Sequence, residues 1–335
     1  MDSMLQSSEI FGSIETQVAE GGEADLHELL KKCQKNPEHK EFIPYTHFNI
    51  NHLPEGLKDA ELYEYIKAEG HLTVRVDVKM TSPHRPKFLP NSNVPYPYCE
   101  PKKKESLRFG SGEVYNVIKF LDGIGQDVRG HKFFRQYSSC VCPKCSLVHS
   151  HGHSGAPSSV WWEIIIRTAT HVVFDDIEAE HTKCKLYYDE QNHPGTILEY
   201  FSVYDQTIET DSFLLKLVVC EGDLGDELFA KRKHCRELWS KVCTKYRNSE
   251  TKLCFIVSHP HGCPKQVSIG EWLTSVKKRE YSKDYDLTKL TYNTCTCPGS
   301  SGAYVHSIGL GGSHVHTGCN GFGINFSGHG IQIKK

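Results

Sequence analysis

Short segments rich in Val, Ile, Phe and Tyr recur through the chain after Ser106, with Gly, Asn and Pro residues between them. Runs of this length and composition, bounded by turn residues, are typical of β-strands. The predicted strands cover Arg108–Phe120, Trp161–Thr168, Lys183–Tyr188, Ile197–Val203, Phe213–Val219, Lys252–Val257, Gln266–Ile269, Ala303–Ile308 and Gly321–Phe326. Many short strands separated by turns favour an all-β sandwich or a pair of barrels.

Apolar residues recur at helical spacing in three other places. Between Asp223 and Tyr246 they return every three or four residues, which predicts an inserted helical segment. Earlier in the chain we expect helices over 25–34 and 57–68, the second ending at Gly70, followed by a strand in HLTVRVDVKM.

These patterns divide the chain into four predicted regions. Residues 1–25 are polar and acidic and predict a disordered tail. Residues 26–82 predict a small α/β region of unknown role, and the proline-rich residues 83–105 predict an extended linker. Residues 106–335 form the candidate catalytic domain.

Composition excludes some partners. The net charge is −2 and the pI is about 6.8, so no overall basic field favours nucleic acid. No apolar run of membrane-spanning length and no secretory leader occurs, so we expect no membrane partner and a cytoplasmic location. In that reducing compartment the 14 cysteines are expected to be thiols, metal ligands or a redox device, whereas a secreted chain would form disulfides.

Three short motifs carry candidate chemistry. Thr168-Ala169-Thr170-His171 follows an apolar strand, Asp211 precedes the strand Phe213-Leu214-Leu215-Lys216-Leu217, and Ser301 lies in Gly299-Ser300-Ser301-Gly302. Each motif alone is weak, since a lone histidine or Gly-x-Ser-Gly turn is common. Together, in the order His, Asp, Ser, they resemble the motifs of chymotrypsin-like serine proteases. Ser300 departs from the Asp or Asn usual there, and Ala303 from the Gly or Ser.

The resemblance implies a mainly β, chymotrypsin-like double β-barrel with an inserted helical segment, preceded by a small α/β N-terminal extension. It also implies a catalytic triad of His171, Asp211 and Ser301. A serine hydroxyl needs a base to take its proton, which is the role of His171, and Asp211 would hold the imidazole. The amides of Gly299 and Ser301 would form the oxyanion hole.

A further resemblance concerns specificity. Thr296 lies five residues before Ser301 and His316 lies fifteen after it. Bacterial glutamyl endopeptidases, and picornaviral cysteine proteases that prefer Gln, have a Thr and a His at similar positions. Both side chains hydrogen-bond a carboxylate or an amide, which gives the hypothesis of cleavage after Glu or Gln. The alternative is that Thr296 and His316 only line a strand.

Cysteine and histidine gather between the first strands. Cys140, Cys142 and Cys145 are followed by His149, His151 and His153, with His149 at the commonest spacing for a fourth ligand. This set predicts a structural zinc site, while free thiols or a histidine-rich loop are the alternatives. Catalysis by the triad requires no cofactor.

The resulting hypothesis is a serine endopeptidase acting on peptide or protein substrates. The alternative is a catalytically idle protease fold that serves as a binding scaffold with a zinc loop. Residues 1–100 are a candidate surface for a protein partner in either case.

Overall fold

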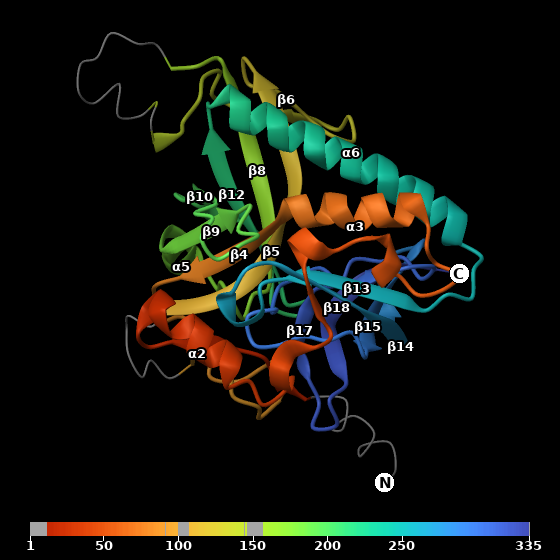
Figure 1. Ribbon diagram of the computed structural model, residues 1–335. Helices are drawn as coiled ribbons and strands as arrows, with labels where there is room; N and C mark the ends of the chain where they lie inside the picture. The colour runs from red at the N-terminus through yellow and green to blue at the C-terminus, as the bar shows by residue number, and fades with distance from the viewer. Residues whose placement is uncertain (1–11, 91, 100–106, 144, 146–156, 335) are drawn as a thin grey trace.

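The computed structural model describes residues 12–90, 92–99, 107–143, 145 and 157–334. Within these residues the chain forms two antiparallel sheets with four α-helices (Figure 1). The prediction of a mainly β protein is confirmed. No helix of the described residues is both long and apolar enough to cross a membrane.

The first sheet has the strand order β10-β9-β4-β5-β8-β12-β11, with β2 and β6 also paired to β5, and β7 to β6. Its strands are β2 (Gln17–Ala19), β4 (Thr73–Val78), β5 (Leu107–Leu121), β6 (Ile124–Asp127), β7 (Lys132–Phe134), β8 (Val160–Thr168), β9 (Thr182–Leu186), β10 (Thr196–Leu198), β11 (Ser202–Thr207) and β12 (Ser212–Val219).

The second sheet has the order β1-β17-β18-β15-β14-β13-β16, with β3 paired to β14. Its strands are β1 (Ser13–Ile14), β3 (Phe42–Pro44), β13 (Leu253–Ser258), β14 (Gln266–Glu280), β15 (Tyr285–Tyr292), β16 (His306–Ser307), β17 (His316–Cys319) and β18 (Asn325–Ile333). The start of β14 was predicted as the strand Gln266–Ile269, but its continuation to Glu280 and its hairpin with β15 were not.

Two helices cover the region where the sheets meet. Helix α3 (Ala60–Leu72) and helix α6 (Gly222–Tyr246) lie side by side (Figure 1), and their apolar faces share one core cluster with strands of both sheets. Two shorter helices are α2 (Leu26–Lys31) and α5 (Asp176–Glu180). Helix α6 agrees with the inserted helix predicted from the apolar spacing.

Helix α3 shows how local sequence sets its ends. The Asp59 carboxylate caps its start by accepting hydrogen bonds from the amides of Glu61 and Leu62, at 2.8 and 3.1 Å. The prediction that Gly70 ends the helix is wrong, because the helix continues to Leu72. Gly70 instead allows close packing, since a Cβ there would lie 2.0 Å from the Tyr45 ring.

The predicted division between residues 26–82 and 106–335 stays a prediction about folding units. In the structure, β4 lies between β5 and β9 in the first sheet, and all six of its residues are buried. Strand β4 therefore packs as an interior strand of the sheet that carries the candidate catalytic histidine.

Candidate active site

The structure brings His171 and Asp211 together. His171 follows the end of β8, and Asp211 directly precedes β12, which pairs with β8. The His171 Nδ1 lies 2.7 Å from one Asp211 carboxylate oxygen, and the His171 backbone amide donates to the other at 3.0 Å. The Thr317 hydroxyl also donates to Asp211, at 2.7 Å. The carboxylate therefore contacts the imidazole directly, and its bonds to the His171 amide and the Thr317 hydroxyl hold it in place.

Ser301 lies in a tight turn that depends on glycine. Gly299 and Gly302 have φ of +97° and +86°, values that residues other than glycine rarely adopt. A Cβ on Gly302 would lie 2.3 Å from the Thr168 hydroxyl, at the end of β8. The amide of Ser111 donates to the Ser301 carbonyl at 2.8 Å, which ties the turn to β5. The turn is thus fixed beside the strand that delivers His171.

The Ser301 hydroxyl donates to the backbone carbonyl of Glu15, at 2.7 Å. No hydrogen bond joins Ser301 to His171 in the described part of the chain, and the buried His171 Nε2 has no hydrogen-bond partner there. The backbone amides of Gly299 and Ser301 likewise have no acceptor among the described residues. The structure therefore pairs the imidazole with the carboxylate, and pairs the hydroxyl with a peptide carbonyl.

The chain on both sides of Glu15 is held as an extended strand. Upstream, β1 pairs antiparallel with β17, with Ser13 opposite Cys319, and the Glu15 amide donates to the Thr317 carbonyl at 3.0 Å. Downstream, β2 pairs antiparallel with β5, with Gln17 opposite Phe109. The N-terminal segment thus crosses the Ser301 hydroxyl while it adds a strand to each sheet.

The Glu15 side chain enters a buried polar pocket. One carboxylate oxygen lies 2.8 Å from His316 Nε2, and the other contacts the Lys35 ammonium. Glu15 is 6% exposed and His316 is fully buried. Burial opposes ionisation of Glu15, but the hydrogen bond from His316 and the charge of Lys35 outweigh it and lower its pKa to about 2. The pocket therefore holds an ionised carboxylate.

Lys35 and Tyr292 organise this pocket. The Lys35 ammonium also donates to the Thr296 hydroxyl at 2.9 Å and to the Asn325 side-chain oxygen at 2.8 Å. The Tyr292 hydroxyl lies 2.6 Å from His316 Nδ1, which leaves Nε2 as the donor toward Glu15. Thr296, predicted to bind substrate, accepts a hydrogen bond from Lys35 and donates one to Asn325 in this pocket.

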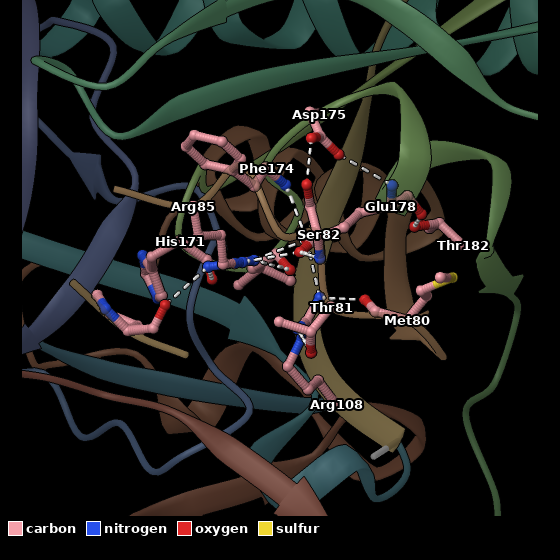
Figure 2. A network of polar contacts seen from close by, with 12 residues as sticks. Met80, Thr81, Ser82, Arg85, Arg108, His171, Phe174, Asp175, Glu178 and Thr182 are labelled. Atoms are coloured by element: carbon pink, nitrogen blue, oxygen red, sulfur yellow. Dashed lines mark hydrogen bonds and ion pairs between the residues drawn. The ribbon is translucent and has the colours of Figure 1, made fainter. Parts of the chain in front are cut away.

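A buried ionic network supports the histidine loop (Figure 2). Arg85 donates to the His171 carbonyl at 3.0 Å and forms a two-point ion pair with Glu178, both bonds at 2.7 Å. Arg108 of β5 donates to the same Glu178 carboxylate at 2.8 Å. Arg85 belongs to the segment predicted as a linker, and here it packs against the loop that carries His171.

Four cysteine sulfurs meet next to the start of β8 and the end of β12. The predicted ligands Cys140, Cys142 and Cys145 gather with Cys220, and their sulfur atoms lie within 4.8 Å of one another. Three of the four residues are buried, and Cys142 and Cys220 are 3.6 Å apart at sulfur. His149 lies outside the described residues. Four thiols at this separation match the donor set of a tetrahedral zinc site.

Several of these residues carry no local sequence signal. Glu15, Lys35, Tyr292 and Cys220 reach their sites only through contacts between distant segments of the chain. Thr317 is the exception, since it directly follows the predicted His316 and lies on the same strand.

No protein-family model and no curated protein sequence matches this chain. Among solved structures it is similar to the HtrA-type protease AlgW with a tripeptide, at a TM-score of 0.37 and 12% identity over 83% of this chain. It is also similar to AlgW with a decapeptide, at a TM-score of 0.36 and 13% identity over 81%. The matches span 60% and 63% of those chains.

Proposed function

We propose that this protein is a serine endopeptidase with a chymotrypsin-like double-barrel fold, and that it cleaves peptide bonds after glutamate. The observation that carries the proposal is the Glu15 backbone, whose carbonyl accepts the Ser301 hydroxyl while its side chain fills the pocket of His316 and Lys35. A peptide bound in this way presents its backbone carbonyl to the nucleophile and its glutamate side chain to the positive charge of Lys35.

The proposed chemistry begins with proton transfer. The Ser301 hydroxyl turns from the substrate carbonyl oxygen toward His171 Nε2, which takes its proton as the oxygen attacks the carbonyl carbon. Asp211 keeps the imidazole in the required tautomer and stabilises the imidazolium. The amides of Gly299 and Ser301 receive the developing oxyanion, at about 3 kcal/mol for each donor. The C–N bond of the substrate then breaks, and the amine leaves with the proton held by His171. Water gives a proton to His171 as it attacks the acyl ester, and that proton returns to the Ser301 oxygen as the acid is released.

Specificity for glutamate over glutamine follows from the Lys35 charge. His316 is buried, and burial lowers its pKa, so the neutral ring donates one hydrogen bond from Nε2. That bond serves a carboxylate or an amide equally well. The ammonium of Lys35, however, forms an ion pair only with the carboxylate.

Covalent labelling tests the nucleophile. A fluorophosphonate probe is expected to attach to Ser301 of the purified chain, with no labelling in the Ser301→Ala variant and strongly reduced labelling in His171→Ala. A folded wild-type protein that hydrolyses no peptide and takes no label on Ser301 would instead support the idle scaffold. A cleavage profile over a peptide library tests specificity, and cuts dominated by Arg, Lys or large apolar residues would overturn it.

We also propose that Cys140, Cys142, Cys145 and Cys220 hold a structural zinc ion. Such an ion would link the loop before β8 to the chain between β12 and α6, and would take no part in the peptide chemistry. Zinc analysis of Cys220→Ser is expected to show one ion fewer per chain than the wild type. An unchanged zinc content in that variant would exclude Cys220 as a ligand.

A further inference from the structure

The N-terminal segment lies in the proposed active site as a substrate would. Antiparallel pairing holds it on both sides of the Glu15–Thr16 bond, to β17 before the bond and to β5 after it. Here the bond between Glu15 and Thr16 is the one presented to Ser301.

We propose that the Glu15–Thr16 peptide bond is cleaved by the Ser301 of the same chain. This inference rests on the proposed function and names its first substrate. Ser301 Oγ attacks the Glu15 carbonyl carbon, the C–N bond to Thr16 breaks, and the Thr16 amine leaves with the proton held by His171. One water molecule then hydrolyses the ester. The products are residues 1–15, ending in the Glu15 carboxylate, and a chain that begins at Thr16.

Cleavage would open the cleft while keeping the pocket. Glu15, the occupant of the pocket, leaves with the released peptide. Lys35 stays with the remaining chain and continues to face Thr296 and Asn325. The cut chain therefore has a vacant pocket with its charge in place, ready for a glutamate from another protein.

Intact mass and N-terminal sequencing of the full chain over time test this proposal. The wild type is expected to lose residues 1–15 and gain Thr16 as its N-terminus, at a rate independent of protein concentration. Ser301→Ala is expected to stay intact. Glu15→Ala is expected to slow the cut at least tenfold, whereas Glu28→Ala, which changes an exposed glutamate of α2, should cut at the wild-type rate.

The outcomes separate the two proposals. A wild-type protein that cleaves added glutamate peptides but keeps its own Glu15–Thr16 bond would overturn self-cleavage and leave the endopeptidase proposal standing. The segment would then have to leave the cleft uncut to admit those peptides. A protein that cleaves neither would overturn both.

A second, independent observation concerns a set of thiol and imidazole side chains beside the nucleophile turn. Cys33, His39, His261 and Cys297 have ligand atoms that all lie within 4.8 Å of one another. The sulfur of Cys297 is 3.5 Å from the sulfur of Cys33 and 3.5 Å from His39 Nε2. Tetrahedral zinc bonds of about 2.0–2.3 Å imply ligand separations of about 3.3–3.8 Å, close to these values.

The surrounding contacts suit this set to a shared ion. His261 is 4% exposed and its Nε2 has no hydrogen-bond partner among the described residues. Its Nδ1 lies 2.8 Å from the Gln17 side-chain oxygen, which leaves Nε2 with a lone pair. The Asn36 side chain donates to the Cys297 sulfur at 3.1 Å, a contact that favours a thiolate.

We propose that Cys33, His39, His261 and Cys297 bind a zinc ion. The ion would fasten the segment that carries Lys35 to the turn that carries Ser301, since Cys33 and Cys297 lie two and four residues from these groups. This site does not depend on protease activity. It has two sulfur and two nitrogen ligands, which distinguishes it from the four-sulfur set near Cys220.

Zinc analysis and X-ray absorption of the purified full chain test this site. We expect one zinc ion fewer in Cys33→Ser and in His39→Ala than in the wild type, and no loss in Cys243→Ser, which changes a thiol of α6. X-ray absorption of the wild-type protein should show nitrogen as well as sulfur ligands around zinc. This measurement does not depend on whether the variants fold. An all-sulfur shell, or full zinc content in both ligand variants, would overturn the proposal.

Discussion

Two side chains around Glu15 contact its carboxylate, one through a charge and the other through a hydrogen bond. Lys35 supplies the charge, and His316, oriented by Tyr292, supplies the hydrogen bond. Lys35 is 20% exposed at its side chain, so its pairing with a substrate carboxylate is only partly screened by water. We therefore expect Lys35 to distinguish glutamate from glutamine, and His316 to bind both side chains.

Replacing Lys35 by Met is expected to reduce the preference for glutamate over glutamine about tenfold, because the ion pair is lost while the hydrogen bond from His316 remains. The measurement is kcat/KM for two peptides that differ only in Glu or Gln before the cut. Lys40→Met, which removes an exposed lysine paired with Glu38, serves as the matched control and should keep the preference. An unchanged preference in Lys35→Met would remove Lys35 from recognition.

At the scale of elements, α5, β5 and the segment before β5 meet at one carboxylate. Glu178 of α5 accepts from Arg85 and Arg108, and all three side chains are buried. Burial lowers the pKa of Arg108 to about 10, although Glu178 partly offsets this. Removing the carboxylate would leave two buried guanidinium groups without their counter-charge.

Glu178→Gln is therefore expected to lower the free energy of unfolding by about 3–5 kcal/mol. Urea denaturation followed by circular dichroism measures this loss. Glu180→Gln changes an exposed glutamate of the same helix and should cost under about 0.5 kcal/mol. Equal stabilities for the two variants would contradict the role given to the network.

The N-terminal segment, residues 12–19, is expected to leave the cleft at acidic pH. Docking lowers the pKa of Glu15 from 4.5 to about 2, so the docked state gains stability above pH 4.5 and loses it as the pH falls from about 4.5 to about 2. Hydrogen exchange of residues 12–19 in Ser301→Ala, corrected for intrinsic rates, should show falling protection over this range. The added Glu15→Gln change should abolish the pH dependence, and its persistence there would assign the effect to another group.

At the scale of the whole molecule, local patterns predicted the elements that carry the candidate triad. The strand β12 and the helix α6 follow from periodicity, because their burial repeats with the strand or helix period. Strand β8 is buried at every residue but its first, and follows instead from a short run rich in Trp and Ile. The insertion of β4 between β5 and β9, and the pairing of β1 with β17, join residues far apart in sequence. Such pairings depend on the tertiary fold and cannot be read from the pattern of apolar residues within either strand.

The same distinction applies to the site. His171, Asp211 and Ser301 were found from short motifs that keep their local sequence context. Lys35 and Cys220 lie in segments with no such context, and only the fold brings them to the pocket and to the other cysteines. The role of His316 as a contact to a glutamate side chain is seen only because the chain's own Glu15 occupies the pocket.

The most direct test of the proposed triad is the coupling between its members. Hydrolysis of a peptide with a single glutamate is compared for Glu15→Ala alone and for Glu15→Ala combined with Ser301→Ala, with His171→Ala and with both, so that the chain's own glutamate occupies the pocket in none of them. Each single change should lower kcat/KM by roughly a thousandfold or more, and the double change should lower it no further, because the two groups act as one unit. A Ser301→Ala variant with an undiminished rate, or losses that multiply in the double variant, would contradict the proposed mechanism.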